Sequence, residues 1–164
     1  QSSGQRPLSF YQKIADQQDV GTRCHWVNRF VPDSEVCEYF YASDILLLLY
    51  SSDFRSASGV LALASLFEIP VLASSGSGPL KDLVGEYDLG VWVEPDSVDA
   101  VRIGIEELLD NLDLLRGKSQ WDAYRSDNGW DRNAQIVLRR LLPHSVDVGK
   151  TPVYSRPAFS DSGK

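Results

Sequence analysis

The sequence lacks methionine altogether and has only two cysteines in its 164 residues. Because even a starting methionine is absent, we expect a fragment or a processed chain. Cys24 and Cys37 do not have the spacing of a metal site, which favours free thiols in a reducing, cytoplasmic compartment. His25 and His144 have no plausible serine or cysteine partner, so the residues indicate no catalytic base, and no metal or cofactor is expected.

Long apolar runs and an excess of positive charge are also missing. The longest apolar run, Ile45–Tyr50, is too short to cross a bilayer, and no signal segment opens the chain. The formal net charge of −7 makes nucleic acid and anionic membrane surfaces poor candidates as partners. With 43% hydrophobic residues the chain can form a core, and its length suits one domain.

Strand-like and helix-like segments alternate along the chain. Apolar spacing and capping residues predict helices over residues 8–18, from Asp33 onward, over 58–67 and 80–84, from Asp96 onward, and over 114–124 and 130–142. Strands are predicted over residues 23–31, 44–50, 70–73 and 90–94. This alternation predicts an α/β fold in which helices flank a parallel sheet.

Several of these segments carry more detailed expectations. The continuous apolar run of residues 44–50 predicts a strand that helices cover on both faces. Residues 58–67 are apolar almost all round, which predicts a buried helix. Asp33 and Asp96 are expected to be helix N-caps. Residues 143–164 lose all periodicity and are predicted to form an extended or disordered tail.

The loop after Tyr50 is the most informative candidate site, because parallel sheets bind ligands at the carboxyl ends of their strands. It reads SSDFRSASGV and runs directly into the predicted apolar helix. The Ser58-Gly59 pair would leave backbone N–H groups free at the positive end of that helix, which suits a diphosphate. The alternative is that Ser58 is a plain N-cap and that Gly59 serves packing.

The loop SSGSGP after Ala73 is a second candidate site. Its small residues would let the backbone approach a ligand, and the helix that begins near Pro79 offers another N-terminus. Gly76 and Gly78 are present, but Lys81 stands where a dinucleotide fingerprint has its third glycine, and no Walker lysine follows. The alternative is a flexible turn.

Joined in order, these pieces resemble a known family. They are Val31-Pro32-Asp33, Ala42-Ser43-Asp44, Ile69-Pro70-Val71-Leu72-Ala73-Ser74, Val93-Glu94-Pro95-Asp96 and the final NGWDRNAQIVLRRLL. The series is similar to the C-terminal domain of the group-one retaining glycosyltransferases, which have the GT-B fold. The resemblance covers residues 1–142 and implies a Rossmann-like domain of a bacterial-type enzyme.

The resemblance implies a nucleoside diphosphate sugar as donor and an N-terminal glycosyltransferase domain as partner. That second domain would supply the acceptor site, so this chain is not expected to be a complete enzyme. Retaining transfer to an unknown acceptor would rest on stabilisation of the leaving diphosphate. The residues implied for the base, the diphosphate and the sugar, in that order, are Arg29, Phe30 and Val31; Ser58, Gly59 and Val60; and Ser75, Gly76 and Ser77.

Two departures from the family pattern affect these expectations. Many members carry two glutamates that contact the donor sugar and the ribose, whereas Arg55 and Leu63 occupy the matching positions here. Neither side chain accepts hydrogen bonds as a carboxylate does, although Arg55 could pair with a phosphate. The family domain also begins with two further strands, so we expect the sheet to lack its first strands and to leave residues 23–28 without their usual partner. The alternative is that the strands pair in an order different from that of the family.

Two other classes stay open at this point. A non-catalytic interaction domain could have kept the glycosyltransferase fold and lost donor binding, as the missing glutamates would suggest. A receiver-like signalling module would need an aspartate at the carboxyl end of a strand, whereas Asp44 stands at the start of one.

Overall fold

The computed structural model describes residues 6–141, without the side chains of residues 130, 131 and 139. The chain divides into two compact units between Tyr39 and Phe40. No helix within the described range is both long enough and apolar enough to cross a membrane.

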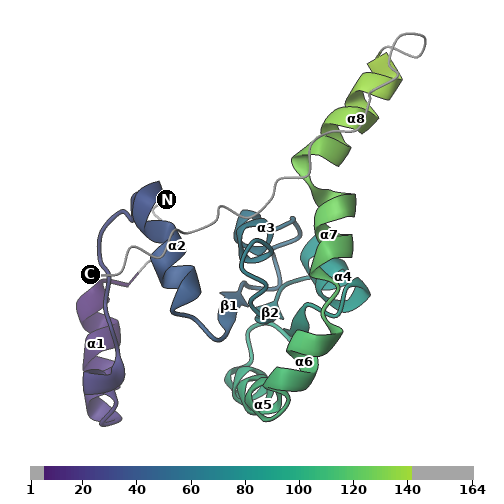
Figure 1. Cartoon of the computed structure of the whole chain (residues 1–164). Helices are drawn as coiled ribbons and strands as arrows, with labels where there is room; N and C mark the ends of the chain where they lie inside the picture. Colours follow the sequence, from purple (N-terminus) through teal and green to yellow (C-terminus); the bar gives the residue numbers. More distant parts are fainter. Residues whose placement is uncertain (1–5, 142–164) are drawn as a thin grey trace, which may run out of the picture. The chain divides into compact units, whose positions relative to one another are not determined.

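The first unit contains α1 (Leu8–Gln17), the short 3-10 helix η1 (Gly21–Arg23) and most of α2 (Asp33–Tyr41) (Figure 1). The prediction of a strand over residues 23–31 is wrong. The described part of this unit has no other strand with which the segment could pair. An isolated strand leaves its N–H and C=O groups without partners, so the segment stays irregular.

Three strands of the second unit form a parallel sheet in the order β1-β2-β3. β1 (Leu46–Leu49) pairs with β2 (Val71–Ser74), which pairs on its other edge with β3 (Gly90–Trp92). Gly90 has a φ of +155°, and a Cβ there would overlap the Val71 backbone, so this position requires glycine. The predicted α/β fold with a parallel sheet is confirmed.

Helices connect the strands and continue after β3. They are α3 (Gly59–Ala64), α4 (Pro79–Glu86), α5 (Val98–Asp110), α6 (Leu112–Lys118), α7 (Trp121–Asn128) and α8 (Trp130–Leu141). The single helix predicted over residues 114–124 is instead the two helices α6 and α7. The chain breaks between them because the Gln120 N–H donates to the Tyr87 carbonyl (2.9 Å).

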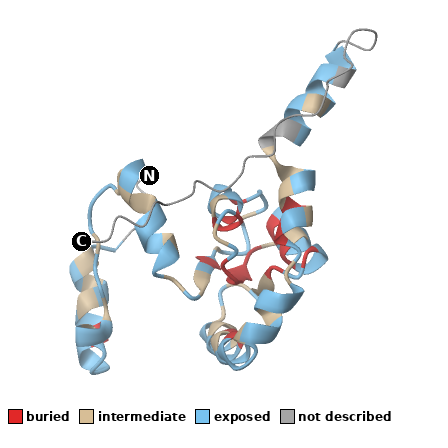
Figure 2. Cartoon of the chain, in the orientation of Figure 1, coloured by how far each residue is buried: buried red, intermediate tan, exposed pale blue. Residues whose placement is uncertain are grey.

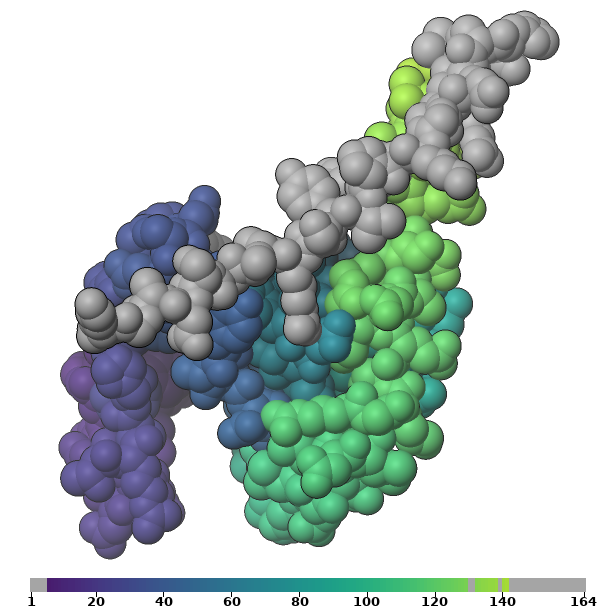
Figure 3. Space-filling model, in the orientation of Figure 1, coloured from purple at the N-terminus to yellow at the C-terminus, as the bar shows by residue number. Residues whose placement is uncertain are grey.

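Helices cover both faces of the sheet. Val71 and Ala73 of β2 pack on one side with buried residues of α3, α4 and α7. On the opposite side Leu72 packs with Leu108 of α5 and with Val93. Figure 2 shows the buried residues gathered at the strands and on the helix sides that face them, and in Figure 3 the green helices α5, α6 and α7 form one continuous surface.

The edge strand β1 is only partly covered. Leu48 is 3% exposed, whereas Leu47 and Leu49, on the opposite face, are 49% and 42% exposed. The prediction of helices on both faces is therefore wrong for β1, although all four residues of β2 are buried. The reason is that α5 packs over β2 and β3, and β1 is the last strand on its side of the described sheet.

Helix α3 is shorter and less buried than its apolar sequence predicts. Leu61 and Ala64 are fully buried, but Val60 is 41% and Leu66 59% exposed. The helix ends because the chain must turn to enter β2, and Glu68 makes that turn with a φ of 56°. Positive φ is unusual for a non-glycine residue, so neighbouring contacts must hold this turn.

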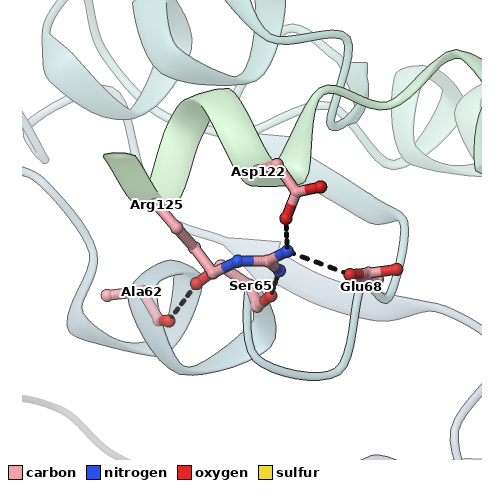
Figure 4. Close-up of polar contacts among 5 residues, drawn as sticks. All are labelled: Ala62, Ser65, Glu68, Asp122 and Arg125. Carbon is pink, nitrogen blue, oxygen red and sulfur yellow. Dashed lines mark hydrogen bonds and ion pairs between the residues drawn. The ribbon is translucent and has the colours of Figure 1, made fainter. Parts of the chain in front are cut away.

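Arg125 of α7 supplies those contacts (Figure 4). Its guanidinium donates to the carbonyl of Ser65, to Glu68 Oε1 (3.0 Å) and to Asp122. Ser65 is buried, and its own hydroxyl donates to the Ala62 carbonyl (2.6 Å). One side chain therefore joins α7 to the end of α3 and to the turn before β2.

We expect Arg125→Ala to lower the free energy of unfolding by about 1–3 kcal/mol, because the buried Ser65 carbonyl and Glu68 lose their charged donor. Urea denaturation measures this change. The control is Arg102→Ala, which removes an exposed pair with Glu106 (2.9 Å) and should change stability by less than about 0.5 kcal/mol. Equal losses in the two variants would contradict the role given to Arg125.

Two buried tyrosines join α4 to α7. The rings of Tyr87 and Tyr124 lie edge to face with centroids 5.6 Å apart. Burial raises the pKa of Tyr87, and the hydrogen bond that its hydroxyl donates to Asp127 (3.0 Å) raises that pKa further. Burial likewise raises the pKa of Tyr124. Both hydroxyls therefore keep their protons in the folded protein at a pH where a free tyrosine ionises.

This difference predicts a loss of stability at high pH. Above about pH 10 the unfolded chain releases tyrosine protons that the folded chain retains, so the free energy of unfolding falls as pH rises. Tyr124→Phe keeps the ring and removes one ionisable hydroxyl, so its stability should fall less steeply above that pH. Urea denaturation of both proteins on either side of about pH 10 measures the slopes, and identical slopes would contradict the prediction.

Candidate functional site

The loop after β1 folds back on itself at the carboxyl edge of the sheet. The rings of Tyr50 and Phe54 stack with centroids 4.0 Å apart and an angle of 12° between their planes. The Tyr50 hydroxyl lies 3.2 Å from Ser58 Oγ, within hydrogen-bonding distance. These contacts bring the end of the loop, where α3 begins, back beside the strand.

The loop after β2 packs directly against this first loop. The Gly76 N–H donates to the Phe54 carbonyl (3.0 Å). A Cβ on Gly76 would overlap the Ser52 carbonyl oxygen, and one on Gly78 would lie 3.0 Å from the Arg55 carbonyl oxygen. Both glycines are therefore needed so that two backbones can approach each other.

A third loop, after β3, is joined to the first of these loops through Asp96. Its carboxylate accepts a hydrogen bond from the Ser52 N–H (3.0 Å), and its φ is 59°. The prediction that Asp96 is a helix N-cap is wrong: Ser97 caps α5 and accepts from the Ala100 N–H (3.2 Å). The aspartate side chain instead ties loops that are 44 residues apart in sequence.

The start of α3 leaves two backbone donors available. Ser58 is its N-cap, as the plainer alternative predicted, and accepts from the Leu61 N–H (3.3 Å). The Ala62 N–H donates to the Ser58 carbonyl (3.3 Å). The N–H groups of Gly59 and Val60 have no acceptor among the described residues, and nothing lies within 4 Å of a Cβ built on Gly59. Gly59 is therefore not a packing glycine.

The remaining residues expected at this edge differ in their exposure. Ser75 is 2% exposed and donates to the Gly76 carbonyl (2.9 Å), whereas Ser77 is exposed. The Arg55 side chain is exposed and makes no hydrogen bond or ion pair with the described residues. Leu63, at the second glutamate position of the resemblance, is half-buried.

Lys81 is a cation at this edge that sequence reasoning did not assign to the site. It lies in the first turn of α4, and its ammonium is 3.7 Å from the centroid of the Trp92 ring. A cation–π contact of this kind fixes a lysine without neutralising it. The sequence signal was the residue that interrupts the glycine fingerprint, but its partner in β3 could not be inferred from spacing.

Arg29, Phe30 and Val31 belong to the first unit. Phe30 is 86% exposed. The Arg29 guanidinium forms a two-pronged ion pair with Glu35, and its hydrogen bond to that carboxylate raises the pKa of Arg29 above its ordinary value. Arg29 is thus engaged with a carboxylate in this structure.

The model of the family "Glycosyl transferases group 1" matches residues 4–120 of the chain. The chain belongs to the group-one glycosyltransferase family. No curated protein and no solved structure matches it significantly. Membership supports glycosyl transfer in general as the chemistry of this protein. Among the described residues, no group of histidine, cysteine, aspartate or glutamate side chains could hold a metal ion.

The family match ends at Gln120, but the packing of this glycosyltransferase continues beyond it. Trp121 and Tyr124 are 4% and 5% exposed and pack with the core residues of α3, α4 and β2. Arg125 holds the turn before β2, as described above. Helix α7 is therefore part of the folded unit that carries the site.

Two glycine variants test the arrangement of these loops. Gly76→Ala should lower the free energy of unfolding by about 1–3 kcal/mol, because the added methyl group would overlap the Ser52 carbonyl oxygen. Gly59→Ala meets open space and should leave stability unchanged or raise it by up to about 1 kcal/mol. Melting temperature and urea denaturation compare the two, and the opposite order would contradict the loop packing.

Proposed function

We propose that this group-one glycosyltransferase chain binds a nucleoside diphosphate sugar and serves retaining glycosyl transfer as the C-terminal half of a GT-B enzyme. The observation that carries the proposal is the junction of three loops at the carboxyl edge of the sheet, beside two backbone donors that have no acceptor among the described residues. Ligands of parallel α/β sheets bind at this edge. Family membership supplies the class of ligand.

The diphosphate would accept hydrogen bonds from the N–H groups of Gly59 and Val60. Helix α3 has only six residues, so its dipole adds little, and the hydrogen bonds themselves are the main contribution. Arg55 and Lys81 add positive charge without a counter-ion among the described residues. Ser75, Gly76 and Ser77 would line the sugar side, and stabilisation of the leaving diphosphate would drive the transfer.

The base would lie against Arg29, Phe30 and Val31 of the first unit. Phe30 is almost fully exposed, and an exposed aromatic ring suits stacking on a base. Pocket residues nearby in the same unit are His25, Trp26 and Asn28, around a cavity of about 260 Å³. Arg29 would have to bind while it remains paired with Glu35.

A second domain would complete the enzyme. Leu47 and Leu49 are exposed on one face of β1, and β1 is the last strand on its side of the described sheet. These observations support the proposal that a helix normally covers that face and that further strands extend the sheet beyond β1. We further propose that residues 1–142 form the C-terminal glycosyltransferase domain, that an N-terminal domain brings the acceptor, and that this chain alone does not transfer sugar.

The predicted tail, residues 143–164, lies outside the described residues. Both cysteines are free, which fits a cytoplasmic location.

A non-catalytic interaction domain is the second candidate. The observation in its favour is the pair of replacements at the family's glutamate positions, where Arg55 is exposed and Leu63 half-buried. Neither can accept hydrogen bonds from the hydroxyl groups of a ribose or a sugar. Donor binding is thus the property that separates the two candidates.

Titration of the ¹⁵N-labelled chain with UDP, GDP and ADP tests the proposal. We expect one of them, at millimolar concentration, to shift the amide signals of Gly59 and Val60, because their N–H groups would donate to the diphosphate. Gly59→Ala should weaken this binding about fivefold or more, since its methyl group would crowd the phosphate.

Gly117→Ala is the matched control, because a Cβ at that position in α6 also meets open space. It should leave the affinity for the nucleotide unchanged. If none of the three nucleotides shifts the Gly59 and Val60 signals, the non-catalytic candidate is favoured instead.

A further inference from the structure

A second cavity lies at the opposite edge of the sheet from the candidate donor site. Its volume is about 300 Å³, and it is formed by residues that precede β1 and β2 together with Arg116 of α6. Tyr41 and Phe67 each stand a few residues before the strand that follows them. The amino and carboxyl edges of a parallel sheet are at opposite ends, so this pocket plays no part in donor binding as proposed above.

Aromatic rings form one wall of this pocket. Phe40 and Phe67 stack with centroids 5.0 Å apart, and the Tyr41 ring meets Phe67 edge-on, also at 5.0 Å. Tyr41 is 68% exposed, although its ring is held by this contact. An exposed aromatic surface suits a ligand with an apolar C–H face.

A carboxylate and a guanidinium also line the pocket, and each is already paired. Glu68 uses Oε1 for its ion pair with Arg125 (3.0 Å), and Arg116 uses Nη2 for its ion pair with Asp44 (3.0 Å). Among the described residues, Glu68 Oε2 and the other guanidinium nitrogens of Arg116 have no partner. The pocket therefore offers one acceptor and several donors, and because Arg125 pairs with Asp122 as well as with Glu68, the group around the acceptor keeps a net negative charge.

We propose that this pocket binds a neutral saccharide at a site separate from the donor site. A phosphate would meet the net negative charge of the group formed by Glu68, Asp122 and Arg125, and an ammonium ion has no acceptor for the donors of Arg116. A sugar hydroxyl, by contrast, can donate to Glu68 and accept from Arg116 at the same time. The C–H face of a pyranose ring packs on aromatic rings, and a cavity of about 300 Å³ lies at the lower end of the usual range for small ligands.

Arg125 positions the Glu68 carboxylate, which is the hydrogen-bond acceptor of this pocket. Glu68 stands at a φ of 56°, a conformation that costs free energy for a glutamate, and the pair with Arg125 holds its carboxylate there. Arg125 is itself anchored on the Ser65 carbonyl (Figure 4). The carboxylate oxygen that a sugar would meet is thus fixed before the sugar arrives, which reduces the entropy lost on binding.

Amide NMR on the full 164-residue chain tests the proposal. The probes are the methyl glycosides of glucose, galactose and mannose, with inorganic phosphate and tetramethylammonium as ionic probes. We expect at least one methyl glycoside, at millimolar concentration, to shift the amides of Tyr41, Phe67 and Glu68, and neither ion to do so. Tyr41→Ala and Glu68→Gln should each weaken this binding about fivefold or more.

The matched control for Glu68→Gln is Glu106→Gln, which also removes the charge of an exposed carboxylate paired with an arginine. It should leave saccharide affinity unchanged. If Glu68→Gln loosens the turn before β2, Tyr41→Ala decides, because that side chain is largely exposed.

Three outcomes would overturn the proposal. They are the absence of shifts with every glycoside, shifts caused by the ions at the same residues, and glycoside shifts confined to the loop of residues 75–77. The last would assign saccharide binding to the donor site alone. UDP binding is measured by the Gly59 amide signal, and saccharide binding by the Tyr41 amide signal. Failure of either proposal therefore leaves the test of the other interpretable.

Discussion

The burial of β2 on both faces is the constraint on which the second unit depends. It pairs with β1 along all four of its residues and with β3 along three of them, and helices pack on both of its faces. A strand with no exposed face can contain only apolar or small residues, and β2 reads VLAS. Once β2 is placed, the loops that leave its two ends must emerge at opposite edges of the sheet.

Different kinds of contact hold the loops at the carboxyl edge and at the amino edge of the sheet. At the carboxyl edge, backbone groups make most of the contacts: Gly76 bonds to Phe54, and Ser52 bonds to the Asp96 carboxylate. At the amino edge, charged side chains do this work, with Arg125 and Arg116 each paired to a carboxylate. The carboxyl edge therefore depends on glycines that let two backbones approach, such as Gly76, whereas the amino edge depends on the identity of a few charged side chains.

The periodicity of the sequence was sufficient to predict most elements of this fold and their order. Residues 70–73 are all apolar, so their composition alone predicts that they are buried. The helices before and after them repeat apolar residues at fixed spacing. The segment after Arg23 was predicted wrongly, because an apolar run becomes a strand only when another strand pairs with it. The exposed face of β1 was missed for a related reason, since the apolar run of residues 44–50 does not indicate which neighbours will cover it.

The candidate site was predictable only where local chemistry decides it. Ser58 and Gly59 alone predict the start of a helix, and the structure has a capped helix there whose first N–H groups have no acceptor among the described residues. Asp96 looked like a cap on the same local grounds, yet the adjacent Ser97 caps α5 and frees the aspartate to bind the Ser52 N–H. Local rules rank both residues as caps, and only a loop 44 residues away selects between them. Residues that join separate loops therefore cannot be found from spacing along the chain, although they fix the geometry of the site.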